Sequence, residues 1–193
     1  MVFILGSRNS HKLAEMSELL PGLSLQRLPE NISEPVENGH SFTENARIKS
    51  ESYARATGQW VIADDSGICV DALDGAPGIY SARFAGHDAC DEDNNRYLLE
   101  RLRGQTNREA HYVCVVSLAS PEGEMFSVEG RCFGKILECE EGDKGFGYDP
   151  LFYSNDLNQS FALSEPEAKS SVSHRAVACR LFMEELQKRE LMK

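Results

Sequence analysis

The stretch "ILGSRNSHKL", residues 4–13, decides how the fold begins. An apolar run typical of a buried strand ends at Gly6, a polar loop follows, and an amphipathic helix is predicted from His11 to Leu20. A strand that leads into a helix through such a loop presents backbone N–H groups and a partial positive charge to an anion. The stretch is not a P-loop, because His11 stands at the place of the second glycine and Leu13 at that of the hydroxyl residue.

The loop between this strand and helix has two interpretations. Its residues are polar or charged, and we take all six as candidate phosphate-binding residues: Ser7, Arg8, Asn9, Ser10, His11 and Lys12. The alternative is an ordinary helix cap made by Asn9 or Ser10, which is a common arrangement.

The rest of the chain alternates helical and strand-like patterns. Strands are predicted at 23–28, 60–63, 110–119 and 125–133, the last two as a hairpin. Helices are predicted at 41–57, from an Asp91 cap to residue 102, and at the C-terminus, where Val177, Leu181, Phe182 and Leu186 share one face. Residues 71–88 and 142–150 are predicted to be loops. Helices at both ends and long strands in the middle favour an α/β fold with a mixed sheet over a doubly wound parallel one.

The composition limits the function classes. The 193 residues are enough for one domain with two lobes. A net charge of -11 repels duplex nucleic acid. No apolar run approaches the roughly 20 residues that span a bilayer, and the N-terminus lacks the apolar region of a signal peptide. We therefore expect a cytoplasmic protein without nucleic-acid or membrane partners, whose six cysteines, none in a C-x-x-C pair, stay reduced.

Two acidic motifs are candidate metal or catalytic sites. Ser41 and Glu44 form a capping-box pattern, which fully accounts for Glu44 locally, although a carboxylate at a helix start could also hold hydrated magnesium. In Ala63-Asp64-Asp65-Ser66-Gly67, adjacent strand residues point to opposite faces, so the two aspartates cannot both serve one site in a regular strand, whereas at a strand end one of them can turn into a cleft. Such a carboxylate could bind magnesium and activate water, and a polar turn is the equal alternative.

The segments "GFGYDP" (145–150) and "KSSVSHR" (169–175) form a further pair of candidates. Phe146 lies between two glycines, where an aromatic ring could stack on a nucleobase. Ser173 is a predicted N-cap, so His174 and Arg175 place positive charge in a first helical turn, against the helix dipole. This misfit hints at an acceptor-rich ligand. The alternative is a glycine hairpin and a solvated helix start.

Together these motifs supply a phosphate site, two carboxylates, an aromatic shelf and a donor pair, which are the parts of a metal-dependent nucleoside triphosphate site. With these motifs in this order along its sequence, the chain resembles the inosine/xanthosine triphosphate pyrophosphatase family. The resemblance covers nearly the whole chain and rests on these segments: SRNSHK (7–12), FTENA (42–46), ADDSG (63–67), GAPGIYSAR (75–83), GFGYDP (145–150), and Lys169 followed by SHR (173–175).

The resemblance implies a fold, an activity and residue roles. The fold would be an elongated α/β domain over residues 1–193, with two lobes that flank a central nucleotide-binding cleft, and the protein would be a homodimer. Its substrates would be deaminated purine nucleoside triphosphates, cleaved to the monophosphate and pyrophosphate with Mg²⁺. Asp65 would be the metal-linked base and Glu44 a second metal ligand, while residues 7–12 would bind phosphate. The sugar and base would be held by Ser66, Phe146, Gly147, Tyr148, Asp149, Lys169, His174 and Arg175.

The sequence departs from the family pattern in the phosphate loop. Ser7 keeps the hydroxyl of the family's usual threonine, but Arg8 and His11 replace frequent glycines. Two other functions stay open: a nucleotide-sensing module without catalysis, and a pyrophosphatase for other modified nucleotides. Two carboxylates at positions 44 and 65 argue against the sensing module, which would not need both.

Overall fold

The protein is described by a computed structural model that covers residues 2–123 and 125–191. The chain divides into two compact units. The first unit comprises residues 1–65, 114–130 and 175–193, and the second unit comprises residues 66–113 and 131–174. Among the described residues, no helix is long and apolar enough to cross a membrane.

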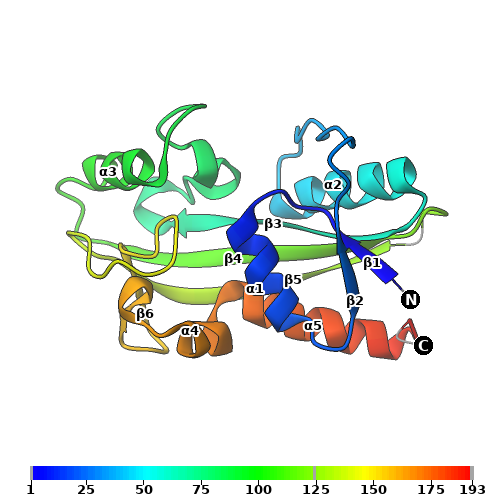
Figure 1. Ribbon diagram of the computed structural model, residues 1–193. Coiled ribbons are helices and arrows are strands. Elements are labelled where there is room, and N and C mark those ends of the chain that lie inside the picture. The colour runs from blue at the N-terminus through cyan, green and yellow to red at the C-terminus, as the bar shows by residue number, and fades with distance from the viewer. Residues whose placement is uncertain (1, 124, 192–193) are drawn as a thin grey trace. The chain divides into compact units, whose positions relative to one another are not determined.

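Seven strands form one mixed sheet, as expected (Figure 1). Their order in the sheet is β2-β1-β3-β4-β5-β6-β7. Strand β1 runs parallel to β2 and β3, whereas β6 is antiparallel to β5 and β7. The strands are β1 (Val2–Leu5), β2 (Ser24–Arg27), β3 (Trp60–Val70), β4 (Glu109–Ala119), β5 (Met125–Ile136), β6 (Phe152–Ser154) and β7 (Gln159–Ser160).

The helices agree with the sequence pattern where the pattern is long. They are α1 (Ser10–Leu19), α2 (Phe42–Thr57), α3 (Asp91–Arg101), α4 (Pro166–Val172) and α5 (His174–Lys188). Cys90, rather than the predicted Asp91, is the N-cap of α3. The predicted loop at 71–88 contains two 3-10 helices, Asp71–Leu73 and Gly78–Arg83, and a third spans Phe161–Leu163. The elements α4, β6 and β7 are not predicted by the sequence pattern, and all three are shorter than eight residues.

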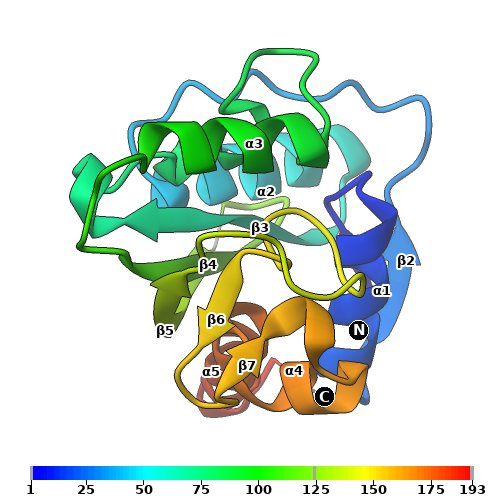
Figure 2. The ribbon, with the colours of Figure 1, turned by 90° about the vertical axis from the view of Figure 1, so that its left-hand side faces the viewer.

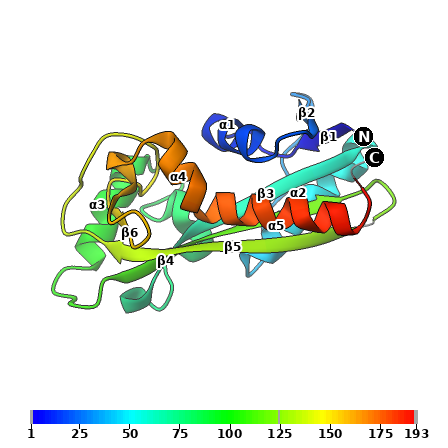
Figure 3. The same cartoon turned by 90° about the horizontal axis from the view of Figure 1, so that it is seen from below.

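The first unit is a sheet covered by helices on both faces. Side chains alternate along β1, so Phe3 and Leu5 pack with α1 and α5, while Ile4 packs with Tyr53 of α2. Figure 1 shows α2 above these strands and α5 below them, and Figure 3 shows α5 lying along the face that it covers. Phe182 and Leu186 share the buried face of α5 as predicted, together with Ala178 and Cys179. Leu181 is 37% exposed, so its predicted place on the same face is wrong.

The second unit has its own hydrophobic core. Ile68, Leu98 and Phe152 come from β3, α3 and β6 and are fully buried. In this core Tyr112 lies with its ring edge against Phe152, at 4.7 Å between ring centroids. Figure 2 shows β6 and β7 side by side. All six cysteines of the protein are free thiols, as expected.

Strand β3 is much longer than predicted. The expectation was a short strand at 60–63 followed by a turn, but the strand continues to Val70 through Asp64, Asp65 and Ser66. The turn at these aspartates is therefore wrong. Because the strand is regular, Asp64 and Asp65 point to opposite faces of the sheet, and the two carboxylates have different surroundings.

Gly67 is the position in β3 where a side chain has least room. A Cβ atom there would lie 2.4 Å from both the carbonyl oxygen of Gly78 and Oγ of Ser81. Since the first of these atoms belongs to the backbone, we expect Gly67→Ala to lower the free energy of unfolding by about 1–3 kcal/mol. Urea unfolding monitored by circular dichroism measures this change. A variant as stable as the wild type would show that residues 78–81 shift to accommodate the added methyl group without a loss of stability.

Candidate active site

The loop before α1 contains the predicted helix cap. Asn9 is the N-cap, and its Oδ1 accepts hydrogen bonds from the backbone N–H groups of His11 (3.0 Å) and Lys12 (3.1 Å). Ser7 Oγ accepts from the N–H of Asn9 at 3.3 Å. Ser10 is the first residue of the helix and is exposed, as is His11. The capping interpretation is confirmed, and the phosphate interpretation stays a prediction.

The two long cationic side chains of this loop point to different partners. The Arg8 guanidinium donates to the carbonyl oxygen of Glu30 at 3.2 Å and pairs with the carboxylate of Glu34 at 3.3 Å. Lys12 is the third residue of α1, and its Nζ lies 3.1 Å from Oδ2 of Asp64. Lys12 therefore joins the loop to β3, while Arg8 joins it to residues 30–34.

Asp64 lies at the centre of a buried group of charges. Its Oδ2 is 3.1 Å from Lys12 Nζ and 3.5 Å from Nη2 of Arg175, whose Nη1 pairs with Glu15 of α1. Burial alone would raise the pKa of Asp64, but the charges of Lys12 and Arg175 outweigh it and hold the pKa well below its usual range. Asp64 is thus an anion at neutral pH that orients Lys12.

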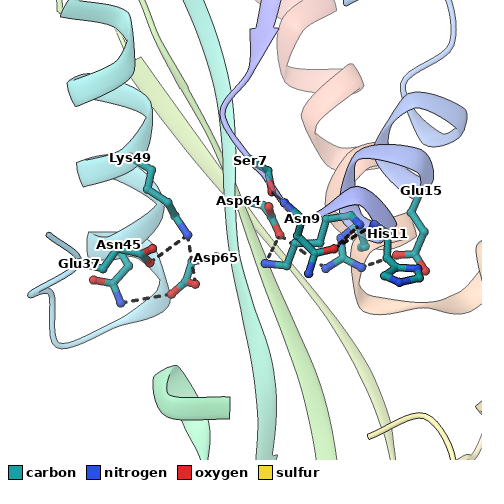
Figure 4. A network of polar contacts seen from close by, with 11 residues as sticks. Ser7, Asn9, His11, Glu15, Glu37, Asn45, Lys49, Asp64 and Asp65 are labelled. Atoms are coloured by element: carbon teal, nitrogen blue, oxygen red, sulfur yellow. Dashed lines mark hydrogen bonds and ion pairs between the residues drawn. The ribbon is translucent and has the colours of Figure 1, made fainter. Parts of the chain in front are cut away.

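Asp65 faces the opposite side of β3 (Figure 4). Its carboxylate accepts from Nδ2 of Asn45 at 3.3 Å and lies 3.5 Å from Nζ of Lys49, both on α2. Lys49 also pairs with Glu37 at 3.0 Å. Burial raises the pKa of Asp65, and the charge of Lys49 offsets only part of this effect. The result is a largely buried carboxylate that is more basic than usual, as a general base requires.

Glu44 lies in the first turn of α2, the helix that carries Asn45 and Lys49. Ser41 Oγ accepts from the N–H of Glu44 at 3.2 Å, while Oε2 of Glu44 accepts from the N–H of His40 at 2.6 Å. The capping role is therefore confirmed, with His40 rather than Ser41 as the returning donor. Glu44 directly precedes Asn45, which places the start of α2 beside Asp65.

The residues around Asp65 fit a magnesium ion in their chemistry. Among residues 2–123 and 125–191 there is no cluster of three His, Cys, Asp or Glu side chains that could hold a metal alone. Magnesium does not need one, because it binds through one or two carboxylates and completes its shell with substrate phosphates and water. Asp65, whose pKa burial raises, is a carboxylate that a cation would stabilise as the anion.

In the second unit, the segment 145–150 is a tight loop with a buried ion pair. Lys169 Nζ lies 2.6 Å from Oδ2 of Asp149, which also accepts from the N–H of Phe146 at 2.9 Å. The same Nζ lies 5.0 Å from the centroid of the half-exposed Phe146 ring, a cation–π distance. Tyr148 is buried, and its hydroxyl donates to the carbonyl oxygen of Ser81 at 2.7 Å. The structure thus brings 146, 149 and 169 together.

The remaining predicted residues lie in three different surroundings. Ser66 is half-buried within β3. His174 begins α5, directly after Ser173 as predicted, and stacks on Tyr112 with ring centroids 4.5 Å apart. Arg175 is only 2% exposed and is engaged by Glu15 and Asp64. The misfit of a cation at this helix start is therefore balanced by carboxylates of the first unit.

Three residues of the charged and polar groups around β3 are not among those predicted from the sequence: Glu15, Asn45 and Lys49. Asp64 has a role separate from that of Asp65. Lys49 lies in the middle of a helix, where an isolated lysine is usually solvated. Its side chain is only 12% exposed here, and carboxylates that include Asp65 raise its pKa although burial lowers it. No local signal in the sequence distinguishes this lysine, because its partner lies 16 residues away.

Comparison with known proteins identifies the family of this chain. The model of the Ham1 family matches residues 3–185. The chain belongs to the Ham1 family. A relative from an Exiguobacterium species, named dITP/XTP pyrophosphatase, is 45% identical over 191 residues, which are 96% of this chain and 97% of the relative. A relative of the same name from Desulforamulus reducens is 44% identical and covers 95% and 94% of the two chains.

Solved structures of Ham1 proteins share the fold. The Ham1 protein of Staphylococcus aureus is 39% identical and has a TM-score of 0.90, with 98% of this chain and all of that chain covered. The dITP/XTP pyrophosphatase of Mycobacterium abscessus is 41% identical and has a TM-score of 0.78, with 94% and 98% covered. The predicted family and mixed α/β fold are thus confirmed. This Ham1 chain carries its charged groups on a sheet that its solved relatives share.

Proposed function

We propose that this Ham1 protein hydrolyses deaminated purine nucleoside triphosphates, namely ITP, dITP and XTP, to the monophosphate and pyrophosphate. Nearly full-length relatives that are named for this activity support the substrate class. One observation carries the chemistry: Asp65 is a largely buried carboxylate of raised pKa, held by Asn45 and Lys49. The protein would remove damaged nucleotides from the cellular pool.

In the proposed reaction, Asp65 accepts a proton from a water molecule whose oxygen attacks the α-phosphorus. A bond forms from this oxygen to phosphorus, the bond to the bridging oxygen of the β-phosphate breaks, and pyrophosphate leaves. Lys49 and Asn45 orient the Asp65 carboxylate. Lys12, directed by Asp64, offsets phosphate charge, and the other residues of 7–12 bind the triphosphate.

Magnesium is part of this proposal. Asp65 and Glu44 would hold it together with substrate phosphates, and the ion would supply neutralisation of the charge on the triphosphate. The chain itself provides the buried base, the cation of Lys12 and the rigid start of α2.

The variant Glu44→Gln separates the capping role from metal binding. Glutamine still accepts the hydrogen bond from the N–H of His40, so the free energy of unfolding should stay within about 0.5 kcal/mol of wild type. If Glu44 holds magnesium, turnover should fall and the magnesium concentration for half-maximal activity should rise about tenfold or more. A magnesium titration of activity measures this. An unchanged titration would leave Glu44 with the cap alone.

Most of the residues that we propose for base recognition belong to the second unit. We propose that Phe146 stacks on the base and that Ser66, Gly147, Tyr148, Asp149 and Lys169 hold base and sugar, as the family resemblance implies. Deaminated purines carry an acceptor oxygen where adenine carries an amino donor. His174 would donate to this oxygen, with Arg175 in a smaller part because Glu15 and Asp64 already engage its guanidinium. We further propose a cytoplasmic homodimer.

The reaction products test the proposal. Incubation of the purified protein with ITP and magnesium should release pyrophosphate and inosine monophosphate in equal amounts, as resolved by ion-exchange chromatography. Release of single phosphate would contradict cleavage between the α- and β-phosphates. Tight ITP binding without any product would instead support the nucleotide-sensing alternative.

A further inference from the structure

Helix α3 holds both backbone polar groups of one residue in the 145–150 loop. Oδ2 of Asp91, the first residue of α3, accepts a hydrogen bond from the N–H of Gly147 at 2.6 Å. Nδ2 of Asn95 donates to the carbonyl oxygen of the same residue at 3.1 Å. The two side chains are four residues apart and therefore lie on one face of the helix. Both belong to the second unit, as does the loop (Figure 2, α3 in green and the loop in yellow).

The residue held in this way has an unusual backbone conformation. Gly147 has a φ of +63°, in the left-handed region that favours glycine. A residue with such a φ does not belong to a regular helix or strand. The orientation of its peptide groups therefore depends on what binds its N–H and C=O. Here α3 binds both groups, so these bonds act on the neighbouring Phe146 together with the bond from its own N–H to Asp149.

Packing alone does not explain why the Asn95 side chain is buried. It is 3% exposed, and its Oδ1 is buried without a hydrogen-bond partner among residues 2–123 and 125–191. The adjacent Asn94, by contrast, uses both ends of its amide, accepting from the N–H of Ala85 at 2.9 Å and donating to the carbonyl oxygen of Ala82 at 3.3 Å. A buried acceptor without a donor is destabilising. Asn95 thus keeps its bond to Gly147 at a cost in stability, as is usual at functional sites.

The other side of the loop is anchored independently. Tyr148 is tied to Ser81, and Asp149 to Lys169. With Gly147 held by α3, three successive residues of the loop have fixed partners. Phe146 is held too, by the bond from its N–H to Asp149 and by Lys169 at 5.0 Å from its ring centroid, and its side chain stays half-exposed. This half-exposed ring is the part of the loop that we expect a ligand to contact.

We propose that Asp91 and Asn95 are positioning residues that set base selection by fixing the peptide of Gly147 and, through it, the ring of Phe146. This inference rests on the proposed function, which assigns Phe146 to the base. In this proposal, Phe146 stacks on the face of the purine and hydrogen bonds read its edge. A Phe146 ring that is rotated or mobile therefore weakens the discrimination between a 6-oxygen and a 6-amino group before it slows the attack on phosphorus.

The test compares Asp91→Ala, Asp91→Asn and the control Glu100→Ala. Asp91 and Glu100 are both exposed residues of α3, so neither alanine variant is expected to change the melting temperature much. Amide hydrogen exchange at Gly147, measured by NMR, reports the lost bond directly and should accelerate about tenfold or more in Asp91→Ala. Asparagine keeps an acceptor oxygen and should restore most of the protection.

The kinetic readout is the ratio of kcat/KM for ITP to kcat/KM for ATP. In Asp91→Ala we expect this ratio to fall about tenfold, the effect of one charge-assisted hydrogen bond, through a higher KM for ITP with kcat nearly unchanged. Asn95→Leu, which removes the second bond and the unpartnered oxygen together, should lower the ratio in the same direction. Glu100→Ala should match wild type.

Two outcomes overturn the inference. If exchange at Gly147 accelerates in Asp91→Ala but the ITP-to-ATP ratio stays at the wild-type value, α3 holds the loop without positioning the base. If neither quantity changes, the bond from Asp91 does not hold the loop. A wild-type protein that fails to prefer ITP is a separate result, seen before any variant is made, and it would remove the proposed function and this inference together.

Discussion

Replacing Asp65 with asparagine is expected to lower kcat for ITP at least about a hundred-fold, because general-base catalysis contributes roughly that much or more. Asparagine is nearly isosteric and can still accept from Nδ2 of Asn45, so the fold should persist. It lacks the basicity that burial gives to the Asp65 carboxylate. Steady-state kinetics at saturating magnesium and ITP measure the effect.

The control for this variant is Asp71→Asn. Asp71 is an exposed aspartate of the 3-10 helix that follows β3, and it loses the same charge. We expect its kcat to match wild type. An Asp65→Asn protein that keeps more than about a tenth of wild-type turnover would be incompatible with a general base worth a hundred-fold, and Asp65 would then be a structural residue of β3.

Replacing Asp64 with asparagine is expected to have the second largest effect, on stability. The change leaves Lys12 without the carboxylate of Asp64 and removes one carboxylate partner of the buried Arg175. Removing one member of a buried ion pair costs about 3–5 kcal/mol, and we expect about 3 kcal/mol because Glu15 remains with Arg175. Urea unfolding at pH 7 measures the loss.

The pH dependence provides the control for Asp64. Its pKa in the folded protein is held below the unfolded value, which is about 3.9. Its stabilisation is therefore fully present above the unfolded pKa and disappears as the pH falls toward the folded pKa. The difference between wild type and Asp64→Asn should shrink below about pH 4. A difference that is the same at pH 7 and pH 3 would mean that the charge of Asp64 is not its cause.

The features that could be predicted from the sequence are those with local causes. The strand, cap and helix at residues 2–20 follow from an apolar run and Asn9, and the start of α2 follows from Ser41 and Glu44. Both caps consist of hydrogen bonds within a few residues, so the sequence pattern contains them. The family followed from the order of six motifs.

The features that could not be predicted depend on distant partners. Asp64-Asp65-Ser66-Gly67 has the composition of a turn, yet it continues β3 inside the sheet, with the two aspartates on opposite faces paired to Lys12 and Lys49. Arg175 violates the local helix-dipole rule, and the carboxylate that balances it, Glu15, is 160 residues away. A pattern within a short window cannot contain such pairs.

The most direct test of the central claim is a comparison of kcat/KM for ITP, XTP, ATP and GTP with the same purified protein and magnesium. We predict pyrophosphate release from ITP and XTP with kcat/KM about a hundred-fold or more above that for ATP, because a site that donates to a 6-oxygen leaves its donors unpaired against adenine. Equal kcat/KM values for ITP and ATP would contradict the claim that this protein selects deaminated purine nucleotides.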